Sequence, residues 1–89
     1  MYYVYIIESK KTGQYYTGQT SDLQKRIVRH NSGRVVSTRN GRPWKLKYSE
    51  ELDSRQKALL LERKLKALKK REALEKYMEN NTRGVAQSG

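Results

Sequence analysis

The amino-acid sequence predicts a small α/β fold of the α+β type, in which helices flank a three-stranded antiparallel sheet. Residues 2–7 and 15–17 are two short runs of aromatic and β-branched residues, and turn-forming residues separate them. Apolar residues alternate with lysines from Trp44 to Tyr48, which is the period of a strand. Leucines recur at helical spacing after residue 54. These observations predict a hairpin, a third strand and an amphipathic helix.

The size of the chain favours a single compact domain. Its 89 residues lie within the usual range of one domain, and two independent cores would be too small to be stable. We expect the domain to cover residues 1–79. Residues 80–89 are too polar to predict an ordered element, so we expect a flexible tail there.

The chain is strongly basic, with 20 Lys and Arg residues against 9 acidic ones and a formal charge of +11 at pH 7. An excess of this size attracts polyanions over a long range, and both nucleic acid and an anionic membrane surface qualify. No apolar stretch approaches the ~20 residues of a membrane-spanning helix. A signal peptide begins with basic residues, whereas this chain has no Lys or Arg before Lys10. We therefore expect a soluble, cytoplasmic protein whose partner is nucleic acid and that does not bind membranes.

The chain has no cysteine and one histidine, which restricts its chemistry. The absence of cysteine excludes disulfides, zinc fingers and catalysis by a thiol. A single histidine leaves oxygen atoms as the ligands of any bound metal. This composition favours a hard cation such as Mg²⁺, held by a carboxylate.

The first two strands are expected to form a hairpin with a defined register. A four-residue loop at residues 10–13 pairs Tyr5 with Gly18 and Ile7 with Tyr16. Tyr5 and Tyr16 then lie on one face of the sheet as diagonal neighbours, about 7–8 Å apart. A slip of one residue would place them on opposite faces, so a shared site depends on this register.

A helix is predicted after the hairpin. Ser21 and Gln24 have the spacing of a capping box, and Leu23 and Ile27 have helical spacing. The Asn-Ser-Gly sequence at residues 31–33 is a plausible end.

Basic and polar residues follow the apolar stripe of this helix. Arg26 and His30 lie one turn apart beside the stripe, so we expect them to border the core. Residues 34–42 are polar and glycine-rich, which predicts a loop. Three exposed arginines in this loop are candidates for binding phosphate: Arg34, Arg39 and Arg42.

The third strand is expected to have one buried and one basic face. Trp44, Leu46 and Tyr48 alternate with Lys45 and Lys47, so the three apolar side chains are predicted to share the buried face. We expect Trp44 to belong to the core rather than to stack on a base.

A long basic helix is predicted from about Ser54. Residues 72–79 either continue it or form a short third helix. The residues expected on its buried face are Ala58, Leu61, Leu65 and Leu68.

Two tyrosine triplets are followed by an arginine, a histidine and a glutamate. The triplets are Tyr3-Val4-Tyr5 and Tyr16-Thr17-Gly18, and the later residues are Arg26, His30 and Glu62. In this order and spacing the chain resembles the GIY-YIG nuclease family, in particular its small stand-alone members. The resemblance covers residues 2 to about 79.

Two positions depart from the triplets of that family. Tyr3 replaces the glycine of the first triplet and Thr17 replaces the isoleucine of the second. Gly18 remains, and we expect its role to be structural, because a missing side chain lets backbone or substrate approach the strand.

The resemblance implies a metal-dependent endonuclease that hydrolyses DNA. Tyr5 would activate a water molecule with the help of Tyr16, and Arg26 would brace the phosphate. Glu62 would hold one Mg²⁺ or Mn²⁺ ion, and His30 would accept the phenolic proton. A phenol has a pKa of about 10, so we expect nearby cations to lower the pKa of Tyr5.

Other readings of the same residues remain open. Glu62 has the spacing of an ion pair with Lys66, four residues on. The chain could be a nucleic-acid-binding module that keeps the fold but does not cleave. It could also present a basic surface to an acidic protein or an anionic lipid, with the tyrosines serving only as core. We expect a monomer or a weak dimer.

Overall fold

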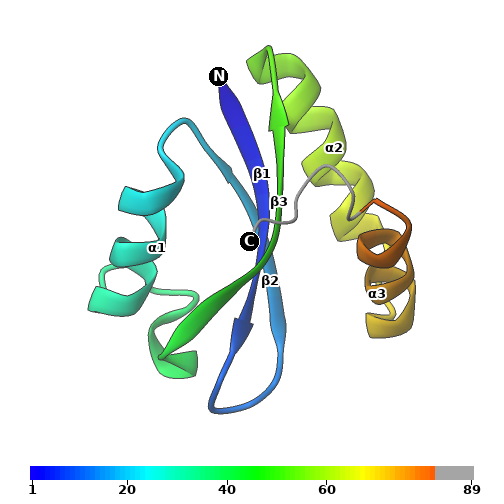
Figure 1. The fold of residues 1–89 in the computed structure, drawn as a ribbon. Coiled ribbons are helices and arrows are strands. Elements are labelled where there is room, and N and C mark those ends of the chain that lie inside the picture. Colours follow the sequence, from blue (N-terminus) through cyan, green and yellow to red (C-terminus); the bar gives the residue numbers. More distant parts are fainter. Residues whose placement is uncertain (82–89) are drawn as a thin grey trace.

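A central sheet separates two layers of helices, as the sequence predicts. The computed structural model describes residues 1–81. Figure 1 shows α1 on one side of the sheet and α2 and α3 on the other. The elements in chain order are β1 (Tyr2–Ser9), β2 (Tyr15–Thr20), α1 (Leu23–Ser32), the short 3₁₀ helix η1 (Arg39–Gly41), β3 (Trp44–Leu52), α2 (Arg55–Ala67) and α3 (Arg71–Asn80).

No helix within residues 1–81 is long and apolar enough to cross a bilayer. The predicted tail at residues 80–89 overlaps the end of α3 at Asn80, and residues 82–89 lie outside the described part of the chain.

The sheet is antiparallel, with strand order β2-β1-β3. The hairpin has the predicted register, because Tyr5 lies opposite Gly18 and Ile7 lies opposite Tyr16. Gly13 ends the turn with φ of +80°, a backbone conformation that favours glycine. The two tyrosines therefore project from the same face of the sheet.

Each face of the sheet has its own core, because successive side chains of β1 alternate between the faces. The core beneath α2 and α3 consists of Val4, Ile6, Tyr48, Ala58, Leu65, Leu74 and Met78. The core beneath α1 consists of Tyr5, Ile7 and Trp44, with Tyr16, Leu23 and Ile27 packed against it. The candidate site lies in the second core.

The prediction of a single buried face for β3 is wrong. The strand has one extra residue, Lys47, opposite the Ile6–Ile7 step of β1. This bulge reverses the alternation of side chains. Trp44 consequently faces α1 and Tyr48 faces α2, while Leu46 is 43% exposed.

The start of α1 also differs from the prediction by one residue. The cap is Asp22 instead of Ser21, and its carboxylate accepts a hydrogen bond from the Lys25 amide at 3.1 Å. Asp22 takes this role because its backbone is extended and its side chain reaches the third amide of the helix. The helix ends before Gly33, where φ is +84°, at the predicted stop.

The C-terminal segment forms two helices, so the alternative of a separate third helix is the correct one. Ser54 caps α2, and its hydroxyl accepts a hydrogen bond from the Lys57 amide at 3.2 Å. Ala58 and Leu65 are fully buried on α2. The chain turns after Ala67 and α3 follows.

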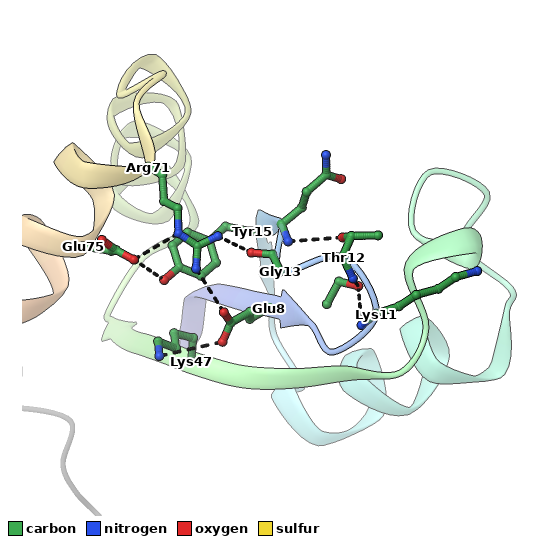
Figure 2. Close-up of polar contacts among 10 residues, drawn as sticks. Glu8, Lys11, Thr12, Gly13, Tyr15, Lys47, Arg71 and Glu75 are labelled. Atoms are coloured by element: carbon green, nitrogen blue, oxygen red, sulfur yellow. Dashed lines mark hydrogen bonds and ion pairs between the residues drawn. The ribbon is translucent and has the colours of Figure 1, made fainter.

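Arg71 connects the start of α3 to the β1–β2 hairpin (Figure 2). Its guanidinium donates to the Gly13 carbonyl and lies 3.1 Å from a carboxylate oxygen of Glu8 and 3.1 Å from one of Glu75. It also stacks 4.1 Å from the ring centroid of Tyr15. These contacts attach α3 to the hairpin.

Candidate active site

Tyr5 and His30 form a buried hydrogen bond at the centre of the site. Tyr5 comes from the middle strand and His30 from the last turn of α1, and both are fully buried. The phenolic oxygen lies 2.8 Å from His30 Nε2. The structure thus brings together two residues that are separated by 25 positions in the sequence.

The other nitrogen of His30 bonds to Thr38, in the loop before η1. His30 Nδ1 lies 2.8 Å from the Thr38 hydroxyl, which is also 3.4 Å from the Val35 carbonyl. A hydroxyl that donates to a carbonyl still accepts, so this network favours the tautomer with the His30 proton on Nδ1. Nε2 is then the acceptor for the Tyr5 hydroxyl. Thr38 is 1% exposed, and its own carbonyl accepts from the Trp44 indole at 2.7 Å.

Tyr16 lies beside the same histidine. Its ring centroid is 5.2 Å from that of His30, with an angle of 62° between the planes. The Tyr5 ring is 5.7 Å from His30 at 65°. The two phenols therefore border one imidazole on the face that the hairpin register predicts.

Gly18 makes room for the Tyr5 hydroxyl. A Cβ atom at this position would lie 2.5 Å from the phenolic oxygen and 2.7 Å from the adjacent ring carbon. Any larger residue would displace the phenol, which explains why glycine occupies this strand position.

Burial is the main cause of the pKa shifts of Tyr5 and His30. It raises the pKa of Tyr5 to about 12, and the charge of Arg26 opposes this effect without cancelling it. Tyr16 and Glu62 raise the pKa further. Burial, and then the charge of Arg26, lowers the pKa of His30. The expectation that the pKa of Tyr5 is lowered is therefore wrong for the protein alone, because desolvation outweighs the charge of Arg26.

Glu62 approaches the site from α2, on the other side of the sheet. One carboxylate oxygen accepts a hydrogen bond from the Gln19 side chain at 3.0 Å, and the other lies 2.8 Å from the Lys66 amine. Gln19 directly follows Gly18 on the outer strand β2, and the Glu62 charge acts on the pKa of Tyr5. Glu62 thus forms the ion pair that its spacing allows and also lies near Tyr5.

The Glu62 carboxylate is the group that would hold a divalent ion at this site. Within residues 1–81 no group of three or more His, Asp or Glu residues could hold a metal. Each Glu62 oxygen has one protein contact and a further lone pair, and the Lys66 side chain is 53% exposed. Mg²⁺ commonly binds one or two carboxylates and completes its shell with water and substrate phosphate.

The loop arginines are exposed, as predicted, but they do not form one group. Arg39 and Arg42 line a pocket of about 420 Å³ near the end of α1, and Arg34 does not line it. Arg42 Nε donates to the Arg39 carbonyl at 2.8 Å.

Sequence reasoning missed Thr38 and Gln19, which contact His30 and Glu62. Both lie outside the two triplets, and neither has a periodic signal. The hydrogen bonds that identify them join residues 8 and 43 positions apart.

Comparisons with known proteins agree with this geometry. The family described as the GIY-YIG catalytic domain matches residues 1–81. A UPF0213 protein of Halobacterium salinarum is 41% identical over 69 residues, which cover 76% of this chain and 88% of that protein. A UPF0213 protein of Staphylococcus saprophyticus is 36% identical over 74 residues, which cover 82% and 89%.

A solved structure also resembles the chain. The solution NMR structure of the UPF0213 protein BH0048 from Bacillus halodurans is similar with a TM-score of 0.59 and 35% identity, covering 91% of this chain and 86% of that one. The fold, the gathered tyrosine and histidine side chains, and the match over residues 1–81 agree. The chain belongs to the GIY-YIG catalytic domain family.

Proposed function

We propose that this protein is an endonuclease that hydrolyses phosphodiester bonds in DNA. The observation that carries the proposal is the buried hydrogen-bond chain from Tyr5 through His30 to Thr38, with the charge of Arg26 acting on its first two members. Membership in a nuclease-type family supports the same reaction class. The basic surface of the chain supports a nucleic-acid substrate.

Tyr5 is the proposed acceptor of the proton of the attacking water. In the resting site Tyr5 is a neutral phenol, because its pKa is raised. His30 is a neutral imidazole, because its pKa is lowered. Tyr5 passes its proton to His30 Nε2, and Thr38 holds the proton on Nδ1 as the imidazolium forms. The resulting phenolate is a strong base, because its conjugate acid has a pKa of about 12.

Arg26 and Tyr16 are proposed to position the substrate and the water. Arg26 presents a planar guanidinium, which pairs with two phosphate oxygens and neutralises charge in the transition state. Its positive charge also stabilises the Tyr5 phenolate. Tyr16 lies beside His30 and would orient the water toward the Tyr5 oxygen.

Glu62 is the proposed ligand of one Mg²⁺ or Mn²⁺ ion. When bound, the ion would supply Lewis acid stabilisation of the phosphate and of the leaving oxygen. Lys66 shares this carboxylate, and its exposed side chain can move aside when the ion binds. Gln19 would keep the carboxylate oriented toward β2.

Nicking of a supercoiled plasmid tests the proposal. The purified protein is expected to relax the plasmid with Mg²⁺ or Mn²⁺ and to lose this activity with EDTA. Glu62→Gln keeps the shape of the side chain but removes its charge, so we expect a loss of at least about 100-fold. Glu51→Gln is the matched control, because Glu51 is exposed on β3 and has no role in the proposed reaction. Equal nicking by both variants would reject Glu62 as the ligand.

A second function, nucleic-acid binding without cleavage, is favoured by two observations. The pKa of Tyr5 is raised and Glu62 is paired with Lys66, so the site is not activated in the protein alone. Such a module would bind DNA with an affinity that falls steeply with salt. It would not cut the plasmid with any divalent metal.

A further inference from the structure

A basic pocket lies at the hairpin end of the molecule. It has a volume of about 420 Å³, and none of the described residues that line it is acidic. Its lining residues are Lys11, Asn31, Arg39, Asn40, Arg42 and Pro43. Three cations around one pocket repel one another, so a bound anion would relieve the repulsion.

Hydrogen bonds hold the hairpin side of this pocket in place. The Ser9 hydroxyl donates to the Gly41 carbonyl at 2.6 Å and accepts from the Lys11 amide at 3.1 Å. The Lys10 amide donates to the Pro43 carbonyl at 2.9 Å. The hairpin turn is therefore fixed against the segment that joins η1 to β3.

The opposite side of the pocket is equally well supported. The Asn31 side chain accepts from the Trp44 amide at 2.6 Å and donates to the Trp44 carbonyl at 3.0 Å, which ties α1 to β3. Arg42 packs over Gly33, where a Cβ atom would lie 2.7 Å from Nη1, and donates to the Arg39 carbonyl. The pocket is thus built from four segments with defined positions.

Two of the three cations remain available to a ligand. Among residues 1–81, neither the Lys11 amine nor the Arg39 guanidinium has a hydrogen-bond or ion-pair partner. In Figure 2 the Lys11 side chain extends away from the turn, and no dashed line reaches its amine. A phosphate group would satisfy both donors.

We propose that this pocket binds a backbone phosphate of the nucleic-acid strand, separate from the phosphate that is cut. Ser9, beside the pocket, is four residues along β1 from Tyr5, or about 13 Å. Phosphates of one DNA strand recur every ~3.4 Å along the axis, so a phosphate in the pocket is a different one from the phosphate at Tyr5. The same loop supplies Thr38 to His30 and Arg39 to the pocket, so a phosphate held there fixes the strand relative to the site. This inference rests on the proposed action on nucleic acid.

The salt dependence of DNA binding tests the pocket independently of cleavage. Fluorescence anisotropy with a short labelled duplex gives the slope of log K against log salt concentration, which changes by about 0.9 per phosphate contact. Replacing Lys11 and Arg39 together by Gln is expected to reduce the slope by about 0.9, because both cations bind the same phosphate. The control replaces Lys69 and Lys70 by Gln, because these exposed lysines lie between α2 and α3, on the other side of the sheet.

The results separate this inference from the proposed nuclease activity. A smaller slope for the pocket variant, with the control near wild type, supports the pocket even if no cleavage is found. Equal slopes for both variants would show that DNA responds to the overall positive charge of the protein and would overturn the proposed pocket. Inorganic phosphate is the second probe, and NMR of the Arg39 and Asn40 amides detects its binding. Strong shifts of these signals, together with unchanged duplex binding by the pocket variant, would mean that the pocket takes a free phosphate. That result would also overturn the proposal of a bound backbone phosphate.

Discussion

At the scale of single residues, the site depends on one phenol in a confined space. Tyr5 is enclosed by its own strand, by the bare backbone of Gly18 and by His30. The sequence was sufficient to predict Tyr5, Tyr16, Arg26 and His30 as a group, because two triplets and a helical spacing relate them. It did not predict the direction of the Tyr5 pKa shift, since desolvation depends on how completely the fold covers the ring.

The histidine makes the stability of the protein dependent on pH. His30 has an ordinary pKa of 6.5 when unfolded, and burial together with the charge of Arg26 lowers its pKa in the folded protein. Above about pH 6.5 it is neutral in both states. As the pH falls below that value, the unfolded chain takes up a proton that the folded protein does not, so stability decreases until the lowered pKa is passed.

Chemical denaturation between about pH 7.5 and about pH 5 measures this effect. We expect the free energy of unfolding to decrease by up to about 1.4 kcal/mol per pH unit from this one group. The ionisable groups that act on or border His30 are Tyr5, Tyr16 and Arg26. His30→Gln is expected to have a shallower dependence, and an unchanged slope in this variant would contradict the assignment.

At the scale of elements, local signals predicted the hairpin, the end of α1 and the start of α2 correctly. The length of the turn and the alternation of side chains fix the β1–β2 register. The bulge at Lys47 was not predictable, because it exists only in the pairing of β3 with β1. The function of the η1 loop was equally hidden, since its contact with α1 depends on the way the chain returns to the sheet.

This loop is expected to control the histidine through Thr38. Thr38→Val keeps the shape of the side chain but leaves the His30 Nδ1 proton without its acceptor, which should cost about 1–3 kcal/mol of stability. We also expect a reduced nicking rate, because either ring nitrogen could then carry the proton. ¹⁵N NMR of the His30 ring reports the tautomer directly.

Thr38→Ser provides the control for this prediction. Serine keeps the hydroxyl, so the rate and the tautomer should stay near those of the wild type. If Thr38→Val also kept the wild-type nicking rate and tautomer, the loop would contribute only packing and would not control His30.

At the scale of the whole molecule, the sheet separates structural packing from the site. The larger core lies beneath α2 and α3, while the side facing α1 holds the two tyrosines and the histidine. Glu62 lies in the other layer, where it accepts a hydrogen bond from Gln19 of the outer strand and where its charge acts on Tyr5. The net charge of +11 predicted a polyanionic partner, but only the folded chain brings Lys11 next to Arg39.

The central claim is that the Tyr5 hydroxyl transfers the proton of the attacking water. The most direct test compares plasmid nicking by Tyr5→Phe and Tyr3→Phe, because both tyrosines lie on β1 and project from the same face. Tyr5→Phe is expected to nick at least about 100-fold more slowly while it stays folded, with a stability lower by about 1–3 kcal/mol for the lost buried hydrogen bond, and Tyr3→Phe is expected to stay near the wild type. Wild-type nicking by folded Tyr5→Phe would contradict the account.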